Sequence, residues 1–298
     1  MRPLHILLAV SVAAVWGFNF VAIKVGLRDM PPLLFTALRF VLAATPLLVL
    51  GVRGGPPVAW RYVLGIGLVL GALQFALLFA GIDAGMPAGL SSLVLQSQAF
   101  FTLLFAALVL GDRPGLRPVA GMAVAFAGIG LIAWDMQVGG SLLGLGLVIA
   151  AAVAWGAGNI IMKQARAPDL FRLMLWVSLV PPLPLFLLSL GLEGPERIVQ
   201  AMIGLTWPGF AALAYIAAGA TLFGFASWGF LLRHHPASLV APFSLLVPIF
   251  GMSSGALLLG EGFSAVKLAG AVLVFTGLAV TVLRLPRGRT APATTLGP

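Results

Sequence analysis

The chain has 298 residues, of which 61% are hydrophobic and only 8% are charged. Soluble domains have about 45–50% apolar and about 25% charged residues, so this composition excludes an ordinary water-soluble protein. The 17 Lys and Arg residues outnumber the 8 Asp and Glu residues. Most of them lie in short connections between apolar runs, where basic residues orient a chain in the membrane. We therefore expect a polytopic helical membrane protein with lipid around it and no nucleic-acid partner.

Polar residues and Gly/Pro breaks divide the sequence into ten apolar segments, each close to the roughly 20 residues that cross a bilayer as a helix. The residues after the last segment, 285–298, are rich in Pro and Gly and are expected to form a disordered cytoplasmic tail. The expected spans are 4–24, 32–52, 62–82, 88–110, 117–135, 141–163, 170–191, 207–231, 237–259 and 263–284.

The distribution of basic residues predicts how the chain lies in the membrane. Twelve Lys and Arg residues fall on the side that carries both termini, four fall on the other side, and Arg39 lies inside a span. The side richer in Lys and Arg is normally cytoplasmic. We therefore expect ten spans with both termini in the cytoplasm.

The two halves of the sequence resemble each other. A shift of 149 residues places Pro87-Ala88 on Pro236-Ala237, and a shift of 139 places Trp16-Gly17 on Trp155-Gly156. Each half holds five spans, so the second half must enter the membrane in the opposite direction. Inverted repeats of this kind are typical of secondary transporters, whose substrate sites lie near the midplane. The expected five-helix repeats are residues 1–135 and 141–284.

Several motifs resemble the drug/metabolite transporter superfamily. Residues 16–27 (WGFNFVAIKVGL) and the triplet at 38–40 (LRF) are of this type, and segments within 85–102 and 241–248 are similar to the EamA branch. Within that branch the chain resembles exporters of cysteine-pathway amino acids such as O-acetylserine and cysteine. The resemblance covers essentially all ten spans. It implies a protein of the bacterial inner membrane that exports small amino acids and related metabolites by alternating access, as a monomer.

Uncharged polar side chains inside the spans are candidate substrate ligands. A polar group without a partner is costly in hydrocarbon, so such side chains face a cavity or another helix. Amides and hydroxyls offer donors to a carboxylate and acceptors to an ammonium group, as a zwitterion requires. In the fourth span Ser92 and Gln96 share one helical face, and Gln98 points elsewhere. The alternative role is hydrogen bonding between helices. The candidates are Asn19, Gln74, Ser92, Gln96, Asn159, Tyr215 and Ser244.

Other residues in the spans have two alternative roles each. Trp16 and Trp155 line a cavity or pack between helices. Arg39 lies about 10 Å along its helix from Pro32, where it attracts a substrate carboxylate or instead snorkels or caps a neighbouring helix. Prolines bend helices, so those inside spans are hinges or static kinks. The hinge candidates are Pro181, Pro182, Pro242 and Pro248.

The carboxylates all fall at or near span ends, whereas proton-coupled carriers often keep one at mid-depth. We expect facilitated transport without an intramembrane carboxylate relay. The G-x-S-x-G pattern at 251–255 lies inside an apolar span with no nearby histidine. Because the chain also lacks cysteine and common metal or nucleotide motifs, we expect no enzyme activity, metal or cofactor. The alternatives are a drug or other metabolite exporter of the same fold, and a lipid scramblase or membrane scaffold.

Overall fold

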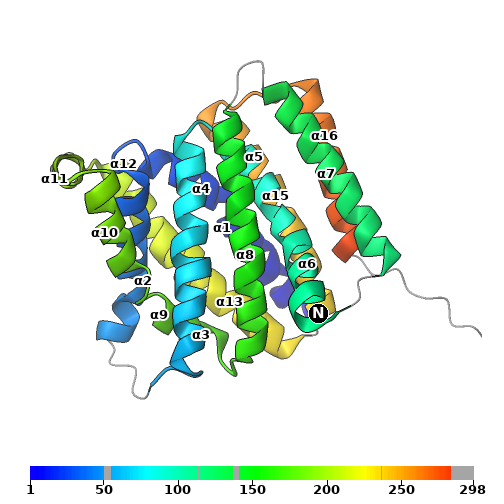
Figure 1. Cartoon of the computed structure of the whole chain (residues 1–298), viewed down its shortest axis with the longest axis horizontal. Helices are drawn as coiled ribbons and strands as arrows, with labels where there is room; N and C mark the ends of the chain where they lie inside the picture. Colours follow the sequence, from blue (N-terminus) through cyan, green and yellow to red (C-terminus); the bar gives the residue numbers. More distant parts are fainter. Residues whose placement is uncertain (50–54, 113–114, 137–140, 236, 283–298) are drawn as a thin grey trace, which may run out of the picture.

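The computed structural model describes residues 1–49, 55–112, 115–136, 141–235 and 237–282, so the expected tail at 285–298 lies outside the described residues. Within these ranges the chain forms helices and no strand, arranged as one bundle (Figure 1). Eight helical segments are long and apolar enough to cross a membrane, and Pro32–Leu47 and Ala265–Thr281 are shorter apolar helices. The prediction of an all-helical polytopic membrane protein is confirmed. The crossing of all ten segments stays a prediction.

Of the ten apolar segments, five are uninterrupted α-helices, and the others consist of consecutive helical pieces. The uninterrupted helices are α1 (Pro3–Gly26), α2 (Pro32–Val49), α7 (Leu116–Met136), α8 (Leu142–Ala165) and α16 (Ala265–Val282). The composite segments are α3 (Trp60–Ile66), η1 (Gly67–Leu73) and α4 (Gln74–Asp83); α5 (Ala88–Val94), η2 (Leu95–Ser97) and α6 (Gln98–Leu110); α9 (Leu170–Val177) and α10 (Pro182–Leu192); α12 (Trp207–Ala214), η3 (Tyr215–Phe223) and α13 (Gly224–His234); and α14 (Ala237–Val240), η4 (Ala241–Leu245) and α15 (Leu246–Leu259).

The irregular pieces occur at corresponding places in the two halves. The third and eighth segments each contain a π-helical piece, η1 and η3. The fourth and ninth segments each contain a 3₁₀ turn, η2 and η4. A shift of 149 residues relates each pair to within a few residues. Such pieces change which backbone groups are paired and are frequent at functional sites.

The helices of one half pack against those of the other in matching pairs. Helix α1 packs against α15 as α8 packs against α6. A Cβ placed on Gly17 of α1 would meet Cβ of Phe250, and one placed on Gly156 of α8 would meet Cβ of Phe101. The shifts found in the sequence relate these two contacts to each other. In each contact a glycine therefore allows a bulky residue of the other half to approach the helix axis.

Helices α7 and α16 lie side by side at one edge of the bundle (Figure 1). Their closest approach occurs at glycines on both helices. A Cβ on Gly121 would meet the carbonyl oxygen of Gly277, and one on Gly128 would meet that of Gly270. Small residues at such positions let two membrane helices approach backbone to backbone.

The seventh span is interrupted at the prolines that the sequence singled out, because the helix ends at Val177 and resumes at Pro182. One feature differs from the sequence prediction: a short helix, α11 (Pro195–Ile203), lies in a connection where no span was expected. Its Ile198 and Ala201 are buried while the residues between them are exposed. Helix α11 is thus amphipathic and covers one end of the bundle instead of crossing it.

Candidate functional site

Three of the candidate ligands lie along the contact between the fourth and ninth segments. The side-chain amide of Gln96 donates to the backbone carbonyl of Ser244 at 2.9 Å. The Oγ atom of Ser92 lies in the space that a Cβ on Gly251 would occupy. Gln96 and Ser92 are both buried. This cluster therefore joins the two halves through uncharged polar groups, and Gln96 presents its amide to a backbone carbonyl of the opposite half.

Asn159 belongs to a second cluster, on the contact between α8 and α6. Its Nδ2 atom donates to Oε1 of Gln98 at 2.8 Å and to Oγ1 of Thr102 at 3.0 Å. Sequence reasoning placed Gln98 away from the candidate face and did not consider Thr102. The spacing of four residues between Gln98 and Thr102 was the available signal, because it puts both on one face of a helix.

Trp16 and Tyr215 form a third cluster, between α1 and η3. The indole Nε1 of Trp16 donates to the carbonyl oxygen of Ala220 at 2.9 Å, and the hydroxyl of Tyr215 donates to the carbonyl oxygen of Val15 at 2.8 Å. The ring of Tyr215 also lies edge-on to Phe18 at 5.0 Å between centroids. Each helix thus satisfies a backbone acceptor of the other.

Gln74 and Asn19 are buried with polar atoms that no described group binds. Gln74 has 0% exposure, and neither atom of its side-chain amide has a partner among the described residues. Asn19 is 7% exposed, and its Oδ1 atom is similarly without a partner in the described part of the chain. An unsatisfied buried polar group is costly. These two amides are therefore the predicted ligands with the most hydrogen-bonding capacity left.

The remaining candidates lie at irregular or packed places. Trp155 packs between two parts of the apolar core. Arg39 is buried beside Thr221 and Phe75, so it does not snorkel to the end of its helix. Pro181 and Pro182 stand at the break between α9 and α10. The two other prolines are in the ninth segment, Pro242 within η4 and Pro248 buried in α15.

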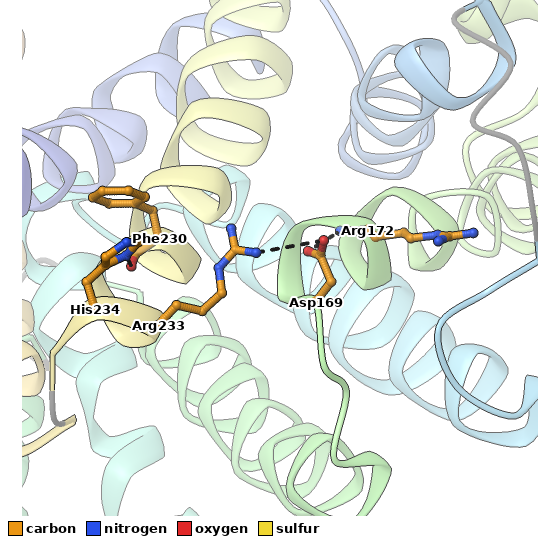
Figure 2. A network of polar contacts seen from close by, with 5 residues as sticks. All are labelled: Asp169, Arg172, Phe230, Arg233 and His234. Carbon is orange, nitrogen blue, oxygen red and sulfur yellow. Dashed lines mark hydrogen bonds and ion pairs between the residues drawn. The ribbon is translucent and has the colours of Figure 1, made fainter.

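The ion pairs of the described residues lie at the ends of the helices. Lys163 and Asp112 are 2.9 Å apart and Lys267 and Asp135 are 3.2 Å apart. Figure 2 shows Asp169 between Arg233, whose Nη1 atom is 3.9 Å from the carboxylate, and the first turn of α9, where the backbone N–H of Arg172 donates to it at 3.1 Å. The uncharged candidate ligands thus lie within the helical segments, whereas the carboxylates of these ion pairs lie at the helix ends.

One cavity, of about 290 Å³, lies at the end of the bundle opposite the N terminus. Its lining includes Arg28, Asp29, Asp83 and Arg197. None of the predicted substrate ligands lines it. The carboxylate of Asp29 also accepts a hydrogen bond from the backbone N–H of Thr206, which precedes α12. This cavity is therefore a charged surface feature separate from the three polar clusters.

Comparison with known proteins places the chain in a family. The model of the EamA-like transporter family matches residues 3–134 and 142–283. The chain is 44% identical over 95% of its length to a protein of Salmonella typhimurium (strain LT2) named "Probable amino-acid metabolite efflux pump", of which it covers 96%. It is 42% identical over 93% of its length to a protein of the same name from Escherichia coli (strain K12), of which it covers 94%.

A solved crystal structure has the same fold. Its sequence is 20% identical to this chain, and the superposition has a TM-score of 0.63. The match covers 97% of this chain and 100% of the solved chain. The likeness at this identity concerns the fold alone. Because the family match covers almost the whole chain and both relatives exceed 40% identity, the chain belongs to the EamA-like transporter family of the drug/metabolite transporter superfamily.

Proposed function

We propose that this protein exports small amino acids and related metabolites across the bacterial inner membrane. The observation that carries the proposal is the high identity, over nearly the whole chain, to two proteins named as probable amino-acid metabolite efflux pumps. The polar clusters agree with it, because amides and hydroxyls bind both charges of a zwitterion without a fixed buried charge of their own. Asn19, Gln74, Ser92, Gln96, Asn159, Tyr215 and Ser244 are the proposed substrate ligands, with Trp16 and Trp155 beside them.

The proposed mechanism is alternating access between two inverted five-helix repeats, 1–135 and 141–284. Support comes from the matched contacts of Gly17 and Gly156 and from the paired irregular pieces η1 with η3 and η2 with η4. In such transporters the two repeats exchange conformations around a central site. Pro181, Pro182, Pro242 and Pro248 are the proposed hinges.

The proposed energetics and orientation follow from where the charges lie. Every side-chain carboxylate is at or beyond a helix end or in the short helix α11, so we propose facilitated transport without a carboxylate proton relay. The excess of basic residues at the end that carries the N terminus supports a cytoplasmic location for both termini. A single chain of ten helices is proposed to act as a monomer.

Flux in proteoliposomes tests the function. Purified protein is reconstituted without an imposed ion gradient, and uptake of a labelled amino-acid panel is compared with empty liposomes. Saturable flux of an amino acid is expected. Flux that appears only with an imposed proton gradient would overturn the facilitated mechanism. Saturable flux of drugs alone would favour the other exporter class, and movement of labelled lipid without solute flux would favour a scramblase.

A further inference from the structure

Arg39 carries a charged group at a depth where the protein offers it little compensation. Its side chain is 2% exposed and lies seven residues into α2, about 10 Å along the helix. The Nε and Nη2 atoms both donate to the hydroxyl oxygen of Thr221, at 3.2 and 3.1 Å. The Nη1 atom has no partner among the described residues. The guanidinium thus keeps one free edge inside the bundle.

No carboxylate neutralises this guanidinium. All eight Asp and Glu residues of the chain are among the described residues. The ion pairs that this described part forms involve Asp112, Asp135 and Asp169, and none involves Arg39. The ring of Phe75 lies 3.7 Å from the guanidinium carbon and supplies cation–π attraction. An aromatic face and one hydroxyl compensate only part of a buried charge.

The unpaired N–H donors of the Arg39 guanidinium indicate which chemical group would bind there. Arginine stays charged in proteins and presents parallel N–H donors that match the two oxygens of a carboxylate. An ionisable residue inside a membrane that faces other helices marks a functional site by default. The counter-ion of Arg39 is not part of the described protein. A solute that the protein binds is the remaining source of such a carboxylate.

The position of Arg39 connects it with the third polar cluster. Its partner Thr221 follows Ala220, whose carbonyl accepts the hydrogen bond from the indole of Trp16. Thr221 also donates its own hydroxyl proton to the carbonyl oxygen of Ile216 at 2.9 Å, within the π-helical piece η3. The guanidinium of α2 and the indole of α1 thus contact consecutive residues of one irregular segment, near the middle of the eighth span.

We infer that Arg39 binds the carboxylate group of the transported solute, so that the protein selects carboxylate-bearing substrates. This inference rests on the proposed transport function and adds the chemical group that is recognised. The uncharged amides of Asn19 and Gln74 remain for the rest of the solute. Arg39 is the only charged residue assigned to substrate.

The test compares amino acids with their amides, which keep the ammonium group but lack the carboxylate. Labelled L-serine and L-alanine are the first probes, each paired with its amide, and the amino acid with the highest flux in the panel is added with its own amide. Wild-type protein is expected to prefer the acid by about tenfold or more in kcat/KM, the scale of one charge-assisted contact. Arg39→Gln is expected to abolish that preference, and Arg39→Lys to keep part of it.

Controls separate binding from folding. Arg197→Gln removes one exposed positive charge and is expected to leave the preference unchanged. Thr221→Val removes the hydroxyl that holds Arg39 and is expected to raise KM while keeping the preference. If Arg39→Gln does not give folded protein, the preference of the wild type and of Arg39→Lys decides the question. Flux without preference for the acid in the wild type overturns the inference, whereas no flux of any probe, with or without an imposed proton gradient, overturns the proposed function itself.

Discussion

The carboxylate of Glu261 caps the first turn of the helix that begins beside Gly89. Its Oε2 atom accepts a hydrogen bond from the backbone N–H of Gly89 at 2.9 Å, and its Oε1 atom accepts one from Ala88 at 2.6 Å. A carboxylate at a helix N terminus accepts hydrogen bonds from backbone N–H groups that have no partner within the helix. It is also attracted by the positive end of the helix dipole. The residue 149 positions earlier, Asp112, is instead exposed and paired with Lys163. The corresponding carboxylates of the two halves thus make different contacts.

Replacing Glu261 by Gln is expected to loosen the end at which α5 begins. The variant loses the negative charge and one of the two acceptor oxygens, at a cost of about 1 kcal/mol. The apparent unfolding temperature, followed by tryptophan fluorescence in detergent, should fall. Asp112→Asn is the matched control, and its effect should be smaller because the side chains of its ion pair are 59% and 51% exposed. Equal shifts in the two variants would contradict this assignment.

Gln74→Met should separate stability from transport. The substitution removes an amide whose atoms have no described partner and keeps a similar side-chain volume. The free energy of unfolding should therefore stay the same or rise by about 1 kcal/mol, while saturable flux should fall. A variant that is less stable and transports normally would show that Gln74 has only a structural role.

Gln98 and Asn159 should be energetically coupled. A double-mutant cycle with Gln98→Leu and Asn159→Leu, measured by unfolding in detergent, is expected to give a coupling energy of about 0.6 kcal/mol, typical of hydrogen bonds between membrane helices. The same cycle on flux reports whether the pair also serves transport. Additive effects on unfolding would contradict the hydrogen bond seen between them.

Gly277→Ala should strain the crossing of α7 and α16. The added Cβ would meet the backbone of Gly121 and the side chain of Ala125, and overpacking of this kind costs about 1–3 kcal/mol. Gly130→Ala is the control on α7, because a Cβ there meets nothing within 4 Å. It should be neutral or slightly stabilising, since alanine favours helix. Destabilisation by both variants alike would argue against a close crossing.

Stability near the N terminus should fall as the pH falls. His5 Nδ1 and His235 Nε2 are 2.6 Å apart. Burial, and then the positive charges of His5, the N-terminal amine, His234 and Arg2, lower the pKa of His235 below its ordinary value of 6.5. Because the folded state binds the proton less readily than the unfolded state, stability is full above about pH 6.5 and is lost below it, towards the lowered pKa.

Unfolding temperatures measured between pH 7.5 and pH 5 check this prediction. The decrease over that interval should be smaller in His235→Gln, which has no ring to protonate. His234→Gln is the comparison, because the His234 ring is more exposed and its Nδ1 atom contacts the carbonyl of Phe230 in its own helix (Figure 2). An identical decrease in wild type and His235→Gln would contradict the role of this pair.

The sequence predicted the helical class and most helix bounds because burial in lipid leaves a strong local signal. Apolar runs of about 20 residues, broken by charge, Gly and Pro, need no knowledge of partners. Pro181 and Pro182 also marked the interruption of the seventh span, where the helix ends at Val177 and resumes at Pro182. The same logic missed α11, whose amphipathic pattern is too short to register as a span.

The polar candidates illustrate the boundary between local and tertiary information. Periodicity put Ser92 and Gln96 on one face, and the structure brings both to the ninth segment. Periodicity also turned Gln98 away, yet Gln98 binds Asn159 of α8. A helix in a bundle has neighbours on several sides, so a residue that does not lie on one face contacts a different neighbouring helix. The sequence alone carries no record of which helix lies there.

By itself the sequence determined that this chain is a bundle of apolar helices with its carboxylates at the helix ends. Those properties follow from the free energy of transferring each segment from water to lipid, which depends on that segment alone. Only the tertiary structure decided which polar atoms were left without partners. Arg39, Gln74, Asn19 and Ser97 differ from most buried polar residues of the described chain because of the groups that their helices meet when they pack. Hydrogen bonds between helices are short and directional, so their formation depends on relative positions that no single segment encodes.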